Sequence, residues 1–123
     1  MRTLQAQSKI PQQSKLLLRT SGRLLLVDAK DLVYAAIEEG RIRLATREME
    51  GESNFRTIEE LQAALDPGLF WRPHRSYLVN VNHIKEVVPW FKSTYQLRMS
   101  DRKSTEIPVS RAQTKRLREL LNL

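Results

Sequence analysis

The sequence has no cysteine among its 123 residues. This absence excludes disulfide bonds, thiolate zinc sites and cysteine nucleophiles. No apolar run approaches the roughly 20 residues that a membrane-spanning helix needs. The first residues, MRTLQAQSKIPQQSK, are basic but lack the apolar segment of a signal peptide. These absences predict a soluble cytoplasmic protein that has no contact with a membrane.

Residues with catalytic or cofactor chemistry are also scarce. The four glycines stand singly, so the sequence has no phosphate-binding glycine loop. His74 and His83 are nine residues apart and have no third ligand at a recognised metal spacing. Ser76 follows His74 by two residues, without the sharp turn or oxyanion loop of a hydrolase. We therefore expect no enzyme activity, no metal site and no cofactor.

Basic residues, in contrast, are abundant and unevenly distributed. The formal net charge is +7 and the pI is about 10.1. Residues 66–123 contain eleven basic and five acidic side chains, whereas residues 28–65 contain five basic and nine acidic ones. Such a distribution indicates a polyanionic partner, although a basic surface that only keeps the protein in solution is the alternative.

The hydrophobic pattern predicts one mostly β domain. Residues 1–14 are polar and rich in glutamine, so we interpret them as a linker or flexible arm, and residues 15–123 as the folded domain. Two apolar runs on either side of Ser21-Gly22 predict a hairpin. Thr57 and Glu60 have the spacing of a helix capping box, and a second helix is expected from Ser110, whose side chain would cap it. The expected core residues are Phe70, Tyr77, Leu78, Val79, Leu97, Leu117 and Leu120.

Three arginines stand at or near the ends of predicted elements, namely Arg41, Arg75 and Arg111. At such positions the backbone is fixed while a long side chain projects beyond the sheet. The planar guanidinium matches the guanine edge in the major groove and also binds phosphate through two hydrogen bonds. Arg111 lies in the expected first turn of the last helix, where free backbone amides favour a phosphate.

Two motifs carry a resemblance to a known family. The stretch LFWRPHRSYLVNVNHIKEV, followed by IPVSR, resembles the signature of the LytTR domain, the DNA-binding effector domain of LytR/AlgR-type bacterial response regulators. The residues that match position by position run from Phe70 to Asn80, except for Trp71 and Pro73, and again from Ile107 to Arg111. The resemblance extends from about Lys15 to the end of the chain.

The resemblance implies an elongated fold of about ten strands in three small antiparallel sheets, with one mid-domain helix and a C-terminal helix. It implies sequence-specific binding of double-stranded DNA for bacterial transcription regulation, by insertion of loops into the major groove. The base contacts carry over to Arg41, Arg75 and Arg111, with Arg43 replacing Arg41 if the turn before it is shifted by one residue. DNA backbone contact or loop support is expected from His74, Arg43, Lys92, Arg102, Lys103 and Lys115.

The resemblance also implies partners beyond the DNA itself. It implies paired direct repeats as the DNA site, a dimer on that DNA, and an N-terminal sensor or receiver domain of a two-component system that this chain lacks. The residues alone leave a second function open, a basic interaction module that binds an acidic protein or an anionic membrane surface. An RNA-binding β domain is less favoured, because the aromatic residues are dispersed and form no stacking platform.

Overall fold

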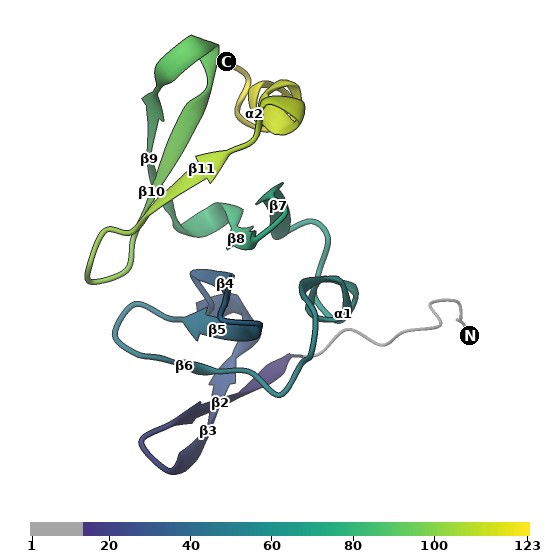
Figure 1. The fold of residues 1–123 in the computed structure, drawn as a ribbon, viewed down its shortest axis with the longest axis vertical. Helices are drawn as coiled ribbons and strands as arrows, with labels where there is room; N and C mark the ends of the chain where they lie inside the picture. The colour runs from purple at the N-terminus through teal and green to yellow at the C-terminus, as the bar shows by residue number, and fades with distance from the viewer. Residues whose placement is uncertain (1–13) are drawn as a thin grey trace.

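Ten strands and two short α-helices make up the computed structural model, which describes residues 14–123 (Figure 1). The predicted linker, residues 1–14, lies almost entirely outside the described residues. A seven-stranded sheet has the order β3-β2-β6-β5-β4-β8-β7, and a three-stranded sheet has the order β11-β10-β9. The strands are β2 (Lys15–Thr20), β3 (Arg23–Asp28), β4 (Tyr34–Glu38), β5 (Arg41–Ala45), β6 (Glu50–Glu52), β7 (Phe70–His74), β8 (Tyr77–Asn80), β9 (Ile84–Pro89), β10 (Tyr95–Met99) and β11 (Glu106–Val109).

The predicted hairpin is confirmed, and a second one has the same turn. Ser21 and Gly22 join β2 to β3, and Glu39 and Gly40 join β4 to β5. All four residues have positive φ, between 49° and 76°. Positive φ at both central positions is the type I′ geometry, whose twist matches that of the flanking strands. The second of these turns sets the direction in which Arg41 leaves the sheet.

The strands form two hydrogen-bonded sheets rather than the three that the resemblance implied. The β2-β3 hairpin is joined to the rest of the larger sheet through a single residue pair, Arg19 and Glu52, between β2 and β6. This one pair is enough to make the hairpin continuous with β5, β4, β8 and β7. The number of strands and helices, and the antiparallel pairing, agree with the expectation.

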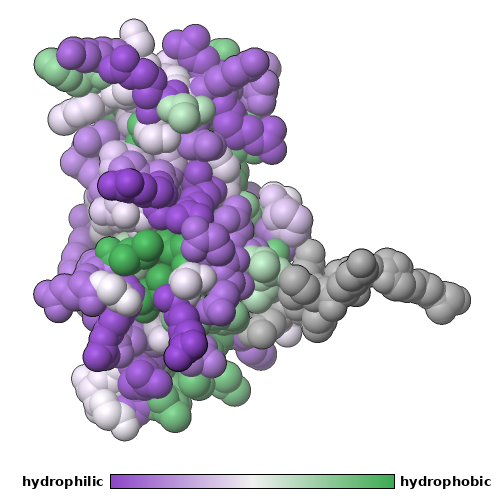
Figure 2. Space-filling model, turned by 45° about the vertical axis from the view of Figure 1, so that its right-hand side comes forward, coloured by the Kyte–Doolittle hydropathy of each residue, from purple (hydrophilic) through white to green (hydrophobic). Residues whose placement is uncertain are grey.

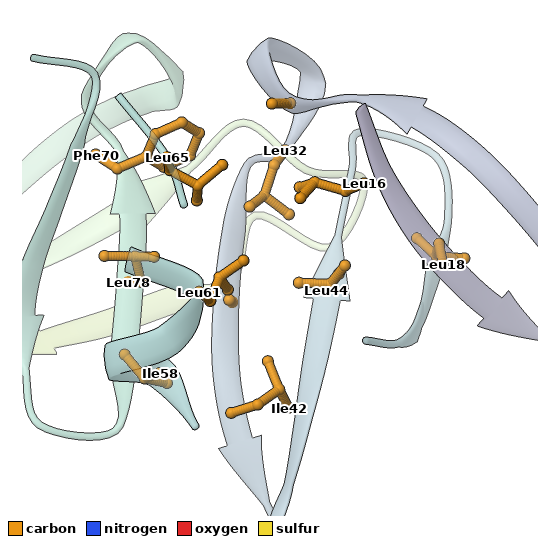
Figure 3. Packing of buried hydrophobic residues seen from close by; sticks show 12 residues of the cluster. Leu16, Leu18, Leu32, Ile42, Leu44, Ile58, Leu61, Leu65, Phe70 and Leu78 are labelled. Carbon is orange, nitrogen blue, oxygen red and sulfur yellow. The ribbon is translucent and has the colours of Figure 1, made fainter. Parts of the chain in front are cut away.

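The larger sheet lies between two hydrophobic cores. One core packs helix α1 (Ile58–Ala63) against the sheet, and Ile58 and Leu61 point from the helix toward Ile42 and Leu44 (Figure 3). The other core packs the three-stranded sheet and helix α2 (Thr114–Leu121) against the opposite face. Strand β8 shows the division, because Leu78 belongs to the first core and Val79 to the second.

The predicted core residues are confirmed. Five of them are buried, and two are half-buried at the margin of the second core. Trp71, one of the two residues between Phe70 and Asn80 that lie outside the family match, is also buried in the second core. The buried predicted residues are Phe70, Leu78, Val79, Leu97 and Leu117, and the half-buried ones are Tyr77 and Leu120.

The two helices begin differently. At α1 the predicted Thr57 cap is present, since the Thr57 hydroxyl accepts a hydrogen bond from the Glu60 backbone N–H at 3.0 Å, while the Glu60 carboxylate accepts from the Arg56 N–H rather than from the Thr57 N–H. At the C-terminal helix the expected Ser110 side-chain cap is absent. The Ser110 carbonyl instead accepts hydrogen bonds from the Gln113 N–H and the Thr114 hydroxyl. Residues Arg111–Gln113 therefore form a 3-10 turn, and the α-helix starts only at Thr114.

Gly51 permits the close contact between β6 and β2. A Cβ atom at this position would lie 2.5 Å from both the Arg19 carbonyl oxygen and Leu18 Cδ2. We expect Gly51→Ala to lower the free energy of unfolding by about 1–3 kcal/mol, because the backbone of β2 must move. Urea unfolding measures this loss. Gly68→Ala is the matched control, since its nearest neighbour is the Asp66 carboxylate oxygen at 3.2 Å; an equal loss in both variants would contradict the packing argument.

Candidate nucleic-acid interface

The turns that carry Arg41 and Arg75 are neighbours at one end of the larger sheet. Arg41 directly follows the β4-β5 turn, and Arg75 lies in the β7-β8 turn. The two hairpins are linked because the Ile37 N–H donates to the Ser76 carbonyl at 3.0 Å. Both arginines are exposed. The pairing of β4 with β8 therefore places two of the three predicted base-contacting residues side by side.

Arg111 lies on the segment that follows β11, and this segment contacts β7. The Ser110 N–H donates to the Pro73 carbonyl at 2.9 Å, so Arg111 begins its turn beside the end of β7. The Trp71 indole N–H donates to the Gln113 side chain at 3.1 Å and so attaches the 3-10 turn to β7. Hydrogen bonds thus join the segments that carry Arg41, Arg75 and Arg111, and each of these arginines is exposed and lies at or just beyond the end of a strand.

Arg72 stabilises the β7-β8 turn through two contacts of its guanidinium. Its guanidinium donates to the backbone carbonyl of Arg75 and forms an ion pair with Glu59 at 2.8 Å. The hydrogen bond from Arg72 lowers the pKa of the Glu59 carboxyl below its ordinary value. In the sequence, Arg72 was matched only as a motif residue. Its position three residues before Arg75 is the feature from which this contact could have been predicted. It connects α1 with the turn that carries Arg75.

His74 also stabilises the β7-β8 turn. Its Nδ1 accepts a hydrogen bond from the Ser76 backbone N–H at 3.1 Å, and its ring packs edge-on against Tyr77 with centroids 5.7 Å apart. Because Nδ1 is an acceptor here, the ring is the neutral tautomer with its proton on Nε2. These contacts fit the loop-support role expected for His74.

A groove separates the two turns from the start of α1. Its volume is about 470 Å³, and the basic residues that line it are Arg56, Arg72 and Arg75. Arg56 was not singled out from the sequence. Its position in a loop before a helix gave no signal, because only the pairing of distant strands brings that loop beside Arg75.

Acidic side chains hold the arginines of β5. Arg41 lies 3.0 Å from Glu52, and its side chain is 70% exposed. Arg43 lies 3.4 Å from Glu50 and 3.5 Å from Glu38, with a side chain that is only 36% exposed. Of the two alternatives for the first base contact, Arg41 therefore has the side chain more accessible to a ligand.

The remaining predicted cations fall into two groups. Lys92 lies in the β9-β10 turn, at the end of β10 where Tyr95 pairs with Val109, and Lys115 follows Arg111 by four residues. Both are near the Arg111 end of the interface. Arg102 and Lys103, by contrast, lie in the β10-β11 turn beside Arg47, at the opposite end of the β4-β5 hairpin from Arg41.

Lys103 is also held by an acidic partner. Its ammonium group lies 2.8 Å from Glu50. This hydrogen bond lowers the pKa of Glu50 and raises the pKa of Lys103. The structure therefore does not bring Lys103 together with the three predicted base-contacting arginines.

His83 has a structural position that the sequence did not indicate. Its Nε2 lies 3.1 Å from the Lys30 carbonyl, and its Nδ1 lies 3.1 Å from the Ser100 hydroxyl. It thereby links the start of β9 to the 3-10 turn Ala29–Asp31 and to the end of β10. Within residues 14–123 no cluster of three metal-ligating side chains is found, nor a helix long and apolar enough to cross a membrane.

Comparisons with known proteins identify a family for this chain. The family model for the LytTr DNA-binding domain matches residues 22–122. Sensory transduction protein LytT of Bacillus subtilis (strain 168) is 39% identical over 111 residues, which cover 90% of this chain and 45% of that protein. Transcriptional regulatory protein YpdB of Escherichia coli (strain K12) is 39% identical over 101 residues, which cover 82% of this chain and 41% of that protein.

A solved structure has the same fold. The LytTr DNA-binding domain of a response regulator from Bacillus cereus has a TM-score of 0.80 and 29% identity, and the match covers 90% of this chain and 99% of that one. This chain spans less than half the length of the LytT and YpdB relatives. The family model covers every strand from β3 onward, both helices and all three exposed arginines. The chain belongs to the LytTr DNA-binding domain family.

Proposed function

We propose that this domain binds double-stranded DNA with sequence specificity and regulates transcription in a bacterium. The observation that supports the proposal is that Arg41, Arg75 and Arg111 are all exposed near strand ends, on segments that hydrogen bonds join to one another. Each guanidinium then inserts into the major groove and donates two hydrogen bonds to a guanine.

The phosphate contacts of the proposal follow from position and charge. Lys92 and Lys115 flank Arg111, so they are placed to neutralise phosphates beside the base that Arg111 contacts. Arg43 and His74 support the β4-β5 and β7-β8 turns through their intramolecular contacts. Arg102 and Lys103 lie beside Arg47, at the other end of the β4-β5 hairpin from Arg41. We therefore assign the main phosphate contacts to Lys92 and Lys115.

We propose further that a second domain controls this one. The relatives LytT and YpdB are named a sensory transduction protein and a transcriptional regulatory protein, and each is more than twice as long as the matched region. A sensor or receiver domain on the N-terminal side of this domain would convert a signal into DNA binding. Paired direct repeats, each occupied by one domain, would form the DNA site and bring two copies together.

Competition binding tests the choice of ligand. A labelled pool of random duplexes is bound to the full chain, and unlabelled duplex, RNA or anionic liposomes are added as competitors. The proposal predicts displacement by duplex DNA at much lower concentration than by RNA or liposomes. Equal displacement by liposomes would indicate a basic interaction module, and equal displacement by RNA would indicate an RNA-binding domain; either result contradicts the proposal.

The ion pair between Glu52 and Arg41 competes with DNA for the guanidinium. An exposed pair of this kind contributes about 0.5 kcal/mol. We therefore expect Glu52→Gln to raise the affinity for duplex DNA about twofold beyond the general effect of removing one negative charge. Glu106→Gln is the matched control, because Glu106 pairs with Arg98 in the other sheet. Fluorescence anisotropy at fixed ionic strength measures both, and an equal gain in the two variants would contradict a role for Arg41.

A further inference from the structure

One edge of the larger sheet is an apolar strand whose outer side pairs with nothing among residues 14–123. Strand β3 is the end strand of this sheet, is six residues long and contains no proline. Its Leu24 is 62% exposed and its Leu26 is 70% exposed. The lower end of the molecule, where β2 and β3 lie in Figure 1, shows hydrophobic residues at the surface in Figure 2.

The other sheet edges of the described residues are protected against pairing. The outer edge of β7 is bound by the Ser110 N–H, which donates to the Pro73 carbonyl. Strand β9 exposes Lys85 and Glu86 and ends at a proline, and β11 contains Pro108. Charge, proline and coverage are the usual means by which proteins prevent edge strands from associating. Between its terminal residues, strand β3 has no charged side chain, no proline and no covering segment. This lack of protection indicates that its edge has a partner.

The backbone of β3 offers its hydrogen-bonding groups at the same two leucines. Thr20 and Arg23 close a two-residue hairpin and therefore form a hydrogen-bonded pair. In an antiparallel ladder, hydrogen-bonded and non-hydrogen-bonded residue pairs alternate. The N–H and C=O groups of Leu24 and Leu26 therefore point away from β2, toward the open edge. The positions with free backbone groups thus coincide with the positions of the exposed apolar side chains.

We propose that β3 pairs with β3 of a second copy of this chain, antiparallel and with Leu25 on the two-fold axis. This register places Leu24 of each copy opposite Leu26 of the other, with their free backbone groups facing one another. The four leucines then share one face of a continuous sheet. Antiparallel pairing places the Arg23 end of each strand beside the Asp28 end of the other, with the two side chains on opposite faces of the sheet, whereas parallel pairing brings like charges directly opposite one another.

The pairing leaves the candidate interface open, because two strands, β2 and β6, separate β3 from β5. It relates the two domains by a two-fold axis, whereas direct repeats hold two domains in the same orientation. The contact therefore belongs to the DNA-free protein and does not depend on the proposed DNA binding. Its area is smaller than the roughly 1,200 Å² of a stable interface, so we expect a dissociation constant on the order of 0.1 mM.

Sedimentation equilibrium of the full chain, up to about 0.5 mM, tests the association at concentrations above that constant. The wild type forms dimers as the concentration rises, and the double variant Leu24→Lys, Leu26→Lys raises the dissociation constant more than about tenfold. Both side chains are largely exposed, so the variant still folds, which circular dichroism checks. Phe91→Lys is the matched control, because Phe91 is 72% exposed in the β9-β10 turn of the other sheet, and its dimer is unchanged. A monomeric wild type, or equal losses in both variants, overturns the proposal.

Cysteine cross-linking tests the register, and the absence of native cysteine makes it specific. Opposed residues of a hydrogen-bonded antiparallel pair have Cα atoms about 5.5 Å apart, which suits a disulfide. Under mild oxidation, a mixture of Leu24→Cys and Leu26→Cys proteins forms a mixed disulfide dimer. Either protein alone does not, because identical positions lie about 9 Å apart. A mixture that gives no more dimer than the single proteins contradicts this register.

Discussion

Alanine at Arg111 is expected to weaken binding to the preferred duplex by about 1–3 kcal/mol and to relax the preference at one base pair. Arg111 is exposed, and its turn is fixed to β7 by the Ser110 and Trp71 hydrogen bonds. The substitution therefore removes a base contact without moving the backbone. A guanine that loses a two-point contact loses its advantage over the other bases. Affinities for the preferred site and for its single-base variants measure this change.

Lys115→Ala provides the comparison on the same segment. It should weaken binding to all sequences alike. It should also reduce the salt dependence of the binding constant by about one released counterion. Lys103→Ala should have a smaller effect than Lys115→Ala, because Lys103 lies at the other end of the β4-β5 hairpin and is paired with Glu50. Equal losses for Arg111→Ala on preferred and random duplexes would count against base contact by Arg111.

Alanine at Leu117 is expected to lower the free energy of unfolding by about 2–5 kcal/mol. Leu117 is the fully buried residue of α2 and belongs to the core between the two sheets. Its loss leaves a cavity where the helix meets β10 and β11, and the half-buried Leu120 and Leu121 cannot fill it. Urea unfolding followed by circular dichroism measures the loss.

Leu123→Ala serves as the control for that measurement. Leu123 is 63% exposed just beyond the same helix, so its removal should change the free energy of unfolding by less than about 0.5 kcal/mol. If the two variants unfold at the same urea concentration, α2 is not held by the second core. In that case the position of the 3-10 turn that carries Arg111 would also lack support.

Local patterns in the sequence predicted much of the fold. The Ser21-Gly22 turn, the Thr57 helix cap and the strands around them are determined by neighbouring residues, so short windows contain the needed information. The two motifs predicted the family, and with it the fold and the exposed arginines. These features needed no knowledge of which distant strands pair.

The features that sequence did not predict depend on distant contacts. Ser110 has the right residue type for a helix cap, but its backbone N–H is bound to the distant Pro73 carbonyl, and its own carbonyl accepts the bonds of a 3-10 turn. The separation of Lys103 from Arg111 follows from the direction of the β10-β11 turn, which the pairing with β9 and the contact with Arg47 decide. Two of the three expected sheets form one continuous sheet, and this continuity depends on the single Arg19-Glu52 residue pair.

Selection from a random duplex pool tests the central claim most directly. The full chain is incubated with duplexes of random sequence, bound molecules are recovered and amplified through several rounds, and the enriched sequences are compared with those from a variant in which Arg41, Arg75 and Arg111 are all alanine. The proposal predicts an enriched site, in two copies of the same orientation, for the wild type and no enrichment for the variant. A wild type that enriches no sequence over bulk DNA, or a variant that enriches the same site, would contradict it.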